Sequence, residues 1–368
     1  MNYNLLPSLE HLATVSVAAL LYNDYEIEKM LEGEKKSPIH SNCKRNETWN
    51  LIEMKIMDSL SSLLPSSLQV KVAEVIHPMR DEVFRWKVDH SFLLKHIGEY
   101  SYIYNSCLSW KTDGTINREQ TTKNLLMNEN IDPKIRFITA CIYFLEDEVL
   151  ALWERIKENH KKSIIRIGTN SAVRFWMKQL KKGNIKHWRE MIEGYFGVPC
   201  IRQSDIPLRL SSFYDFLSSE SKQKYIKFFG AHQVHTHDLR LCLKNKHENE
   251  CREIFRSRPD AALFICLRWP FRSLYIKMAE EIISYLTAKN LSTLLLVMIV
   301  SYIQDGYEDF QLFEEIWKMS PAALKNDVMK DIRFFLWTKR LLEEANHSQP
   351  LEKIVRKCYL DEALQLME

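Results

Sequence analysis

The sequence predicts an all-α protein. Only 9 of the 368 residues are glycine, whereas average usage corresponds to about 26. Glycine and the 11 prolines are spaced about one to every 18 residues, which is the length of one helix with its connection. The hydrophobic content of 46% is enough for a large core. Within this class we expect an irregular α-α hairpin array, that is, solenoid-like helical repeats. The alternatives are a non-repetitive helical domain and a mixed structure.

The first predicted helices follow from apolar spacing. Residues 12–22 are apolar, but Glu10 and His11 adjoin them and no basic segment precedes them. The stretch therefore predicts a first helix and not a signal peptide. Apolar residues three and four positions apart next predict a helix with one core-facing side. That side consists of Trp49, Ile52, Ile56, Leu60 and Leu63.

Two segments, 66–89 and 132–156, each predict a pair of helices. In the second segment, Asp132 is suited to cap the first helix. The segments match at an offset of 66 residues, which aligns an acid pair at 81–82 with another at 147–148. Two hairpins of about 33 residues would produce this offset, and that is a common repeat size in α-solenoids. Each acid pair is expected in the first turn of a second helix, where it stabilises the helix dipole.

Residues 109–116 are the best candidate for β structure, because Asp113-Gly114 would close a hairpin turn. The alternative is a loop that leads into a helix from Asn117.

Residues 197–207 interrupt the helical pattern. They predict a division into an N-terminal helical portion, 1–197, and a C-terminal helical portion, 206–368, within one continuous array. The most apolar run, 291–303, is shorter than the roughly 20 residues that span a bilayer, so we expect a buried central helix there. The helices expected after the interruption are 207–229, 238–257, 260–268, 271–286, 291–304, 306–318, 321–344 and 350–366.

The 8 cysteines are never spaced as metal ligands, and most have apolar neighbours. Such a pattern is typical of reduced, buried thiols and predicts an intracellular, cytoplasmic protein.

A basic segment is the main binding signal. From Arg155 to Arg189 there are 11 Lys/Arg residues and one acid, a net charge of +10. If 171–182 is a helix, its basic residues lie on the side opposite its core-facing residues. The core-facing residues are then Val173, Trp176, Met177 and Leu180. The candidate binding residues are Arg174, Lys178, Lys181, Lys182, Lys186 and Arg189.

A basic stripe of this kind binds an acidic protein surface, a nucleic acid or an anionic membrane. Nucleic-acid proteins usually add exposed aromatic rings, whereas Trp176 and Trp188 fall on apolar helical positions. Among binding partners, an acidic protein or the chain's own acidic stretch, 305–315, is therefore favoured over a nucleic acid. The first expectation for the segment itself is a solvated face without a partner.

A histidine cluster is the second polar signal. His232, His235 and His237, with Cys242 and Cys251, are chemically suited to bind zinc. Their spacing is not a zinc pattern, and Cys242 is expected to face the core, so we predict no metal. The alternatives are a pH-responsive surface cluster and a loop before a helix whose first turn contains Asp238.

No catalytic template is present: there is no phosphate loop, no Gly-x-Ser-x-Gly and no His-Glu-x-x-His. We therefore predict no catalytic residue and no cofactor. The expected function is that of a non-catalytic, intracellular helical-repeat protein that acts as a protein-protein interaction scaffold. The alternative is binding of nucleic acid or an anionic surface through 155–189.

Several motifs in a fixed order resemble a large family of uncharacterised arachnid proteins. They are Leu-Pro-Ser-Leu-Glu-His at 6–11, Asp-Pro-Lys-Ile-Arg-Phe-Ile at 132–138, the stretch 144–153, Ala-Val-Arg-Phe-Trp at 172–176, His-Asp-Leu-Arg-Leu-Cys-Leu at 237–243 and Trp269-Pro270. The family has no assigned activity, so the resemblance implies a shared helical architecture and a many-copy, lineage-specific role, but no site residue.

Overall fold

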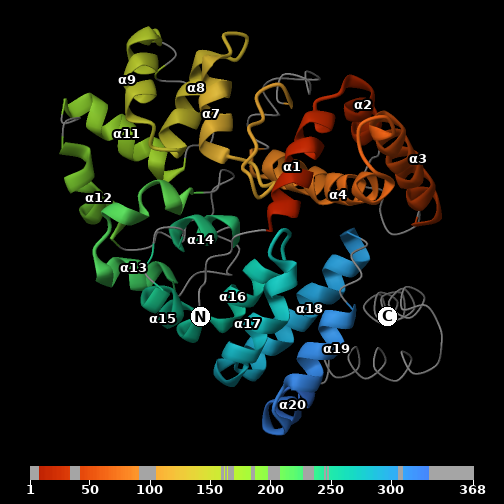
Figure 1. Cartoon of the computed structure of the whole chain (residues 1–368). Coiled ribbons are helices and arrows are strands. Elements are labelled where there is room, and N and C mark those ends of the chain that lie inside the picture. The colour runs from red at the N-terminus through yellow and green to blue at the C-terminus, as the bar shows by residue number, and fades with distance from the viewer. Residues whose placement is uncertain are drawn as a thin grey trace, which may run out of the picture. The chain divides into compact units, whose positions relative to one another are not determined.

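The computed structural model is helical throughout the residues that it describes (Figure 1). Among these residues there is no strand, which confirms the all-α class. Two compact units make up the chain, Met1–Glu34 with Thr48–Glu248 and Lys35–Glu47 with Asn249–Glu368. The structure describes residues 8–33, 42–90, 105–158, 161, 164, 170–183, 187–197, 208–226, 236–243, 246, 248–305 and 310–330.

The first unit begins with α1 (Leu9–Tyr22), α2 (Tyr25–Gly33), α3 (Asn42–Leu60, from Thr48 onward) and α4 (Ser66–Asp89). The predicted side of α3 is buried at Trp49, Ile52, Ile56 and Leu60. Leu63, however, is 73% exposed, so its assignment to this side was wrong. Because α3 ends at Leu60, the next residues no longer follow the helical period.

Helix α4 corrects the prediction of a helix pair at 66–89, because it is one continuous helix with Pro78 inside it. Its buried side includes Val72, Ile76, Met79, Val83 and Trp86. These positions alternate steps of four and three residues on both sides of the proline, so one straight stripe faces α1 and the core. The acid pair at 81–82 is consequently buried inside a helix instead of lying in a first turn.

The second predicted pair is confirmed as α8 (Pro133–Ile142) and α9 (Glu146–Arg155). Asp132 caps α8 by accepting the Lys134 N–H at 2.8 Å, and the acid pair at 147–148 lies in the first turn of α9. The offset of 66 residues therefore relates a single helix to a helix hairpin, not two hairpins. The structure does not confirm a repeat.

Residues 109–117 combine the two alternatives considered for them. Trp110 and Ile116 form one isolated antiparallel bridge, closed by a turn in which Gly114 has φ +85°. The side chain of Asn117 then accepts the Gln120 N–H at 3.2 Å and caps α7 (Arg118–Met127). The turn and the cap together fix where Arg118 starts its helix.

The core of the first unit's remaining part is aromatic. It lies among α8, α11 (Ser171–Lys182), α12 (Trp188–Phe196), the 3₁₀ turns η2 (Leu210–Ser212) and η3 (Tyr214–Phe216), α13 (Ser219–Ile226) and α14 (Thr236–Leu243). The Phe144 ring is at its centre, with five ring centroids 5.3 to 6.0 Å away. Those rings belong to Phe175, Trp176, Trp188, Phe196 and Phe213.

The second unit contains α15 (Glu248–Ser257, from Asn249 onward), α16 (Pro259–Cys266), η4 (Arg272–Leu274), α17 (Tyr275–Ile282), η5 (Ile283–Tyr285), α18 (Ala288–Asp305), α19 (Phe310–Met319) and α20 (Ala322–Met329). Helix α16 packs on α17 and α18, and α18 packs on α19 and α20. The apolar run 291–303 is the expected buried helix, with Leu291, Leu294 and Leu295 fully buried. Among the described helices, none is long and apolar enough to cross a membrane.

Several expected helices are broken in the structure. The segments 207–229 and 238–257 each divide into separate elements, and 271–286 divides into η4, α17 and η5. Part of 321–344 and all of 350–366 lie outside the described residues. The expected boundary at 197–207 falls within the range of the first unit.

The thiol prediction is confirmed where the structure describes the side chain. Five cysteines there are buried and free of disulfides: Cys107, Cys141, Cys242, Cys251 and Cys266. Burial raises the pKa of the Cys266 thiol to about 12.

Candidate functional site

The predicted basic stripe is a surface of α11. The Asn170 side chain caps this helix by accepting the Val173 N–H at 3.1 Å, and Gly183, with φ +70°, ends it. Val173, Trp176, Met177 and Leu180 are buried, as expected. The opposite side is exposed and, with Arg189 of α12, is called the basic face here: Arg174, Lys178, Lys181, Lys182 and Arg189. Lys186 lies outside the described residues.

Two cations of the basic face lie over aromatic rings. The Lys178 ammonium is 5.8 Å from the Tyr195 ring centroid. The Arg189 guanidinium is 5.2 Å from the Trp188 ring and 3.5 Å from the Glu146 carboxylate. Such exposed contacts contribute little energy and leave the charge accessible.

Lys178, Lys181 and Lys182 form no ion pair within the described part of the chain.

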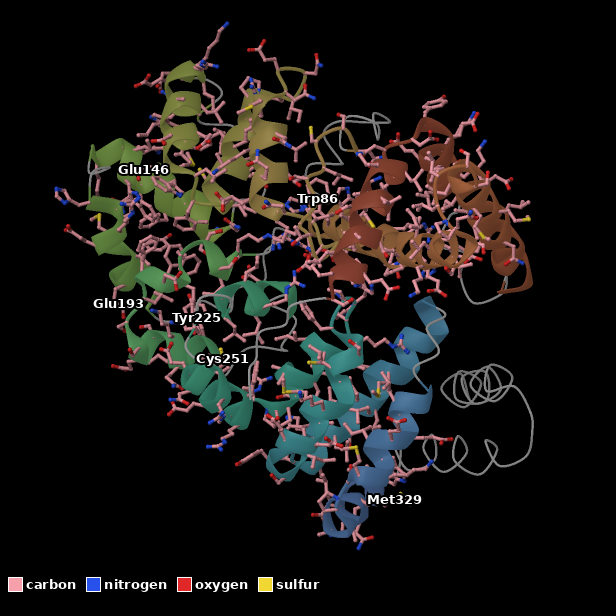
Figure 2. All side chains as sticks on the ribbon, viewed as in Figure 1. Trp86, Glu146, Glu193, Tyr225, Cys251 and Met329 are labelled. Carbon is pink, nitrogen blue, oxygen red and sulfur yellow. The ribbon has the colours of Figure 1, made fainter. Side chains whose placement is uncertain are left out.

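The carboxylates of α12, Glu190 and Glu193, have partners of their own (Glu193 is labelled in Figure 2). Glu193 accepts hydrogen bonds from the Ser218 backbone N–H at 2.8 Å and from the Ser221 hydroxyl at 2.6 Å. The hydrogen bonds from Ser221 and Ser218 lower the pKa of Glu193. Glu190 lies 3.2 Å from the His187 ring nitrogen. Neither acid forms an ion pair with Lys178, Lys181 or Lys182 within the described residues.

The acidic stretch 305–315 belongs to the second unit, so pairing with the basic face stays a prediction.

The histidine cluster is described only in part. His232, His235 and the side chain of His237 lie outside the described residues. Cys242 is buried in α14, as expected. In the part of the chain that the structure describes, no three or more His, Cys, Asp or Glu residues are placed to hold a metal ion.

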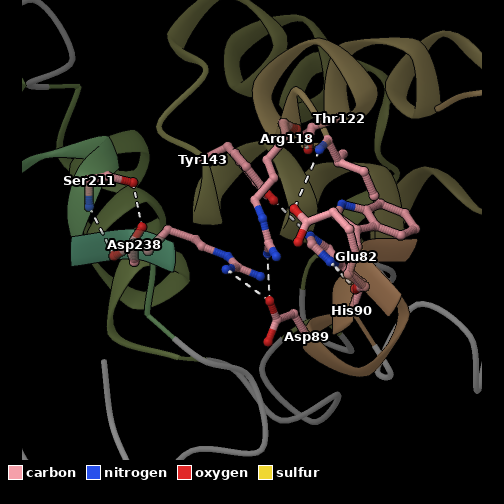
Figure 3. Close-up of polar contacts among 11 residues, drawn as sticks. Glu82, Asp89, His90, Arg118, Thr122, Tyr143, Ser211 and Asp238 are labelled. Atoms are coloured by element: carbon pink, nitrogen blue, oxygen red, sulfur yellow. Dashed lines mark hydrogen bonds and ion pairs between the residues drawn. The ribbon is translucent and has the colours of Figure 1, made fainter. Parts of the chain in front are cut away.

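A second polar site, which sequence reasoning missed, is buried in the first unit (Figure 3). Its members come from α4, α7, η2 and α14, and from the residues that follow α4 and α8 or precede η2. Arg118 and Arg209 are each only 3% exposed. We call the group the buried charge cluster: Glu82, Asp89, His90, Arg118, Tyr143, Arg209, Ser211 and Asp238.

Two guanidinium groups meet at one carboxylate in this cluster. The Asp89 Oδ2 atom lies 2.5 Å from Nη1 of Arg118 and 3.5 Å from Nη1 of Arg209. Burial by itself would lower the pKa of Arg118, but the carboxylates of Asp89 and Glu82 outweigh it, so the pKa is raised. A guanidinium keeps its charge in a protein, so two cations share Asp89 as a close ion-pair partner.

His90 is held in its neutral form beside these arginines. Its Nδ1 atom lies 2.8 Å from the Trp86 carbonyl oxygen, which only accepts, so Nδ1 carries the proton. Its Nε2 atom then accepts from the Tyr143 hydroxyl at 2.8 Å. Burial, followed by the charges of Arg209 and Arg118, lowers the pKa of His90 well below its ordinary value.

Asp238 positions the Arg209 segment. It accepts the Ser211 backbone N–H at 3.1 Å and the Ser211 hydroxyl at 2.5 Å, which joins η2 to α14. Burial raises the pKa of Asp238, although the charge of Arg209 opposes the shift. The residue lies in the first turn of α14, as predicted, but its contacts are tertiary.

One signal for this cluster is present in the sequence. Asp89 continues the buried stripe of α4 beyond Val83 and Trp86, and Arg118 lies one turn before the buried Thr121 and Thr122. A charged residue on a core-facing position needs a partner, but the stripe alone does not identify the partner.

Comparison with known proteins finds no family model, no curated protein and no solved structure that matches the chain.

Proposed function

We propose that the protein is a non-catalytic, intracellular interaction scaffold that binds an acidic protein partner through the basic face. One observation carries the proposal: Lys178, Lys181 and Lys182 are exposed on one side of α11 and have no ion-pair partner in the described chain. Their charges are therefore available to an incoming acidic surface, which they would attract over a Debye length of about 8 Å at physiological salt.

The spacing of these lysines strengthens the proposal. Lys178 lies three residues before Lys181 and four before Lys182, so the side chains are neighbours on the helix. Like charges at these spacings destabilise a helix by about 0.2 to 0.5 kcal/mol per pair. The helix dipole favours cations in the last turn and so accounts for Lys181 and Lys182, but not for Lys178. An acidic partner would replace this repulsion by attraction.

The aromatic residues favour a protein over a nucleic acid. Trp176 and Trp188 are 0% and 3% exposed, so neither offers a face on which a base could stack. Lys178 and Arg189 lie over the rings of Tyr195 and Phe216, which engages those rings as well. Nucleic acid or an anionic surface is kept as the alternative because the same lysines would contact phosphates.

The packing of successive short helices supports a helical array. Helix α8 packs on α7, α9 and α11 in turn, which is the local arrangement expected for an irregular α-α hairpin array. The five described cysteines are buried and form no disulfide, which supports a reducing, cytoplasmic location.

The test compares two triple variants with the wild-type chain. The first reverses the basic face as Lys178→Glu, Lys181→Glu and Lys182→Glu. The second makes the same change in net charge elsewhere, as Lys29→Glu, Lys277→Glu and Lys289→Glu, at exposed lysines outside that face. Each chain is used to capture proteins from a nuclease-treated cell extract, and the captured proteins are identified by mass spectrometry.

We expect the wild-type chain and the second variant to retain the same acidic proteins, and the first variant to lose them. Equal capture by all three chains would refute the proposal. Fluorescence anisotropy with a labelled duplex and a labelled single strand tests the alternative. Binding that weakens steeply with salt and is lost only in the first variant would favour nucleic acid instead.

A further inference from the structure

We propose that Arg118 and Arg209 form a buried binding site for a phosphate group. This site is separate from the basic face, and its ligand is different from the acidic protein proposed above. Both arginines are 3% exposed, and both approach the same oxygen of Asp89 (Figure 3). Such buried pairs of guanidinium groups match the geometry of phosphate oxygens, to which they donate two parallel hydrogen bonds.

The unfilled hydrogen-bond donors of Arg118 and Arg209 support this site. A guanidinium has five N–H donors, and within the described residues the ion-pair contact of each group is to Asp89 Oδ2. The Nε and Nη2 atoms of Arg118 and of Arg209 are buried and have no hydrogen-bond partner within the described part of the chain. Buried polar atoms in native proteins are rarely left in this state, and an unplaced ion or water is a common explanation.

The other polar side chains of the buried charge cluster have partners of their own. Both carboxylate oxygens of Asp238 accept from Ser211. The Tyr143 hydroxyl donates to His90, and the Tyr143 ring lies 5.7 Å from the Arg209 guanidinium carbon. The cluster therefore holds the two guanidinium groups in place without satisfying their remaining donors.

A phosphate group fits these donors better than water does. Asp89 is the close ion-pair partner of both guanidinium groups, and the charges of Glu82 and Asp238 also act on the pair, so the unfilled N–H donors, and not a missing charge, favour a ligand with many acceptor oxygens. One phosphate also offers several acceptor oxygens to donors on both arginines at once. His90, which is neutral and accepts from Tyr143, adds no competing positive charge.

Both arginines are held before a ligand arrives. Arg118 is the first residue of α7, where Asn117 caps the helix. Arg209 immediately precedes η2, which Asp238 ties to α14. A ligand that binds such a site spends little free energy on ordering the side chains.

The first test uses the wild-type chain. Thermal unfolding is measured in inorganic phosphate and in sodium chloride at equal pH and ionic strength. If the dissociation constant is about 0.1 mM, about 10 mM phosphate raises Tm by about 5 °C. A Tm that is the same in both salts would overturn the proposal.

Two variants locate the effect. In Arg209→Gln the phosphate-dependent rise in Tm should be lost, whereas in the control pair Lys178→Gln and Lys182→Gln it should persist, because those lysines belong to the basic face. Loss of the rise in the control pair with retention in Arg209→Gln would assign phosphate to the surface and overturn the buried site.

Asp89→Asn keeps the proposal testable if Arg209→Gln does not fold. Removing this carboxylate leaves both guanidinium groups without their close ion-pair partner, so phosphate should bind more tightly and raise Tm by more than in the wild-type chain. An Asp89→Asn chain whose stability is equally low with and without phosphate would show that the pair is structural only. The titration is then repeated with glycerol phosphate. Equal binding of glycerol phosphate and inorganic phosphate indicates a site for a phosphoryl group on a larger molecule, whereas binding of inorganic phosphate alone indicates a site for the free anion.

Discussion

Phe144 occupies a position that normally requires glycine, and this leads to an unusual prediction. It follows the C-cap residue of α8 and has φ +53°. The Leu145 N–H donates to the Ala140 carbonyl at 3.1 Å, and the Phe144 N–H donates to the Cys141 carbonyl at 3.2 Å. These two bonds define a Schellman motif, in which the left-handed residue is usually glycine. Phe144 is retained there although its side chain strains the backbone.

The left-handed backbone of Phe144 destabilises the fold, whereas the packing of its ring stabilises it. A left-handed conformation costs a residue with a Cβ about 1 kcal/mol relative to glycine. The ring is 7% exposed and contacts five other aromatic rings, and removing such a ring costs about 3 to 5 kcal/mol. Phe144→Ala loses the ring and keeps the strain, whereas Phe144→Gly loses the ring and relieves it.

We therefore expect Phe144→Gly to be more stable than Phe144→Ala by about 1 kcal/mol. The matched control is Phe175, which is fully buried inside α11. There the order should reverse, because glycine in a helix interior is about 1 kcal/mol less stable than alanine. The difference in free energy of unfolding between the Gly and Ala variants should thus change by about 2 kcal/mol between Phe144 and Phe175.

The assay is urea unfolding followed by tryptophan fluorescence, since Trp176 and Trp188 contact the Phe144 ring. Free energies of unfolding are obtained by linear extrapolation for the four variants. Equal stability of the two Phe144 variants, or the same order at both positions, would refute the role assigned to the left-handed backbone.

Three further predictions concern single residues. Gly197→Ala should destabilise the protein by about 1 to 3 kcal/mol, because a Cβ there would lie 2.4 Å from the Glu193 carbonyl oxygen; Gly194→Ala, with open space around it, should be neutral or stabilising in the same urea assay. The pKa of His90 is lowered in the folded state, so the unfolded chain binds the proton first as pH decreases. The free energy of unfolding should therefore fall below about pH 6.5, by up to about 1.4 kcal/mol per pH unit. Chemical denaturation at pH 7.5 and about pH 5.5 should show a smaller loss of stability in His90→Gln than in the wild-type chain, and an equal loss would contradict the assignment. The thiol of Cys266 is buried, with its pKa raised to about 12, so a thiolate-specific disulfide reagent at pH 8 should modify it only on unfolding, and rapid modification of the native chain, mapped by mass spectrometry, would refute its burial.

Local patterns predicted those elements whose stability is set within a few residues. The α11 helix has a cap at Asn170, a glycine end at Gly183 and apolar residues on one side, and each of these signals is local. The same holds for Asp132 at the start of α8. The helix pair predicted at 66–89 was wrong: a proline inside a helix is costly, but the continuous buried stripe of α4 outweighs the cost of Pro78.

The two candidate sites also differ in how far local sequence patterns predict them. Exposure of Lys178, Lys181 and Lys182 follows from the helical period, so the sequence predicted the basic face before any contact was known. The buried charge cluster joins Asp89, Arg118 and Arg209, which lie 29 or more residues apart along the chain. A local sequence pattern does not identify the distant residue with which a buried charge forms an ion pair.

The sequence by itself determined that the chain is helical, where α11 and the α8–α9 hairpin begin and end, and which side of α11 is charged, because helix periodicity and capping act over one or two turns. Only the tertiary structure decided that 66–89 is one helix, that Phe144 takes a glycine-type position, and that two arginines meet at Asp89. In each of those cases the burial of surface between distant segments outweighs a local preference, and that free energy belongs to the packed unit.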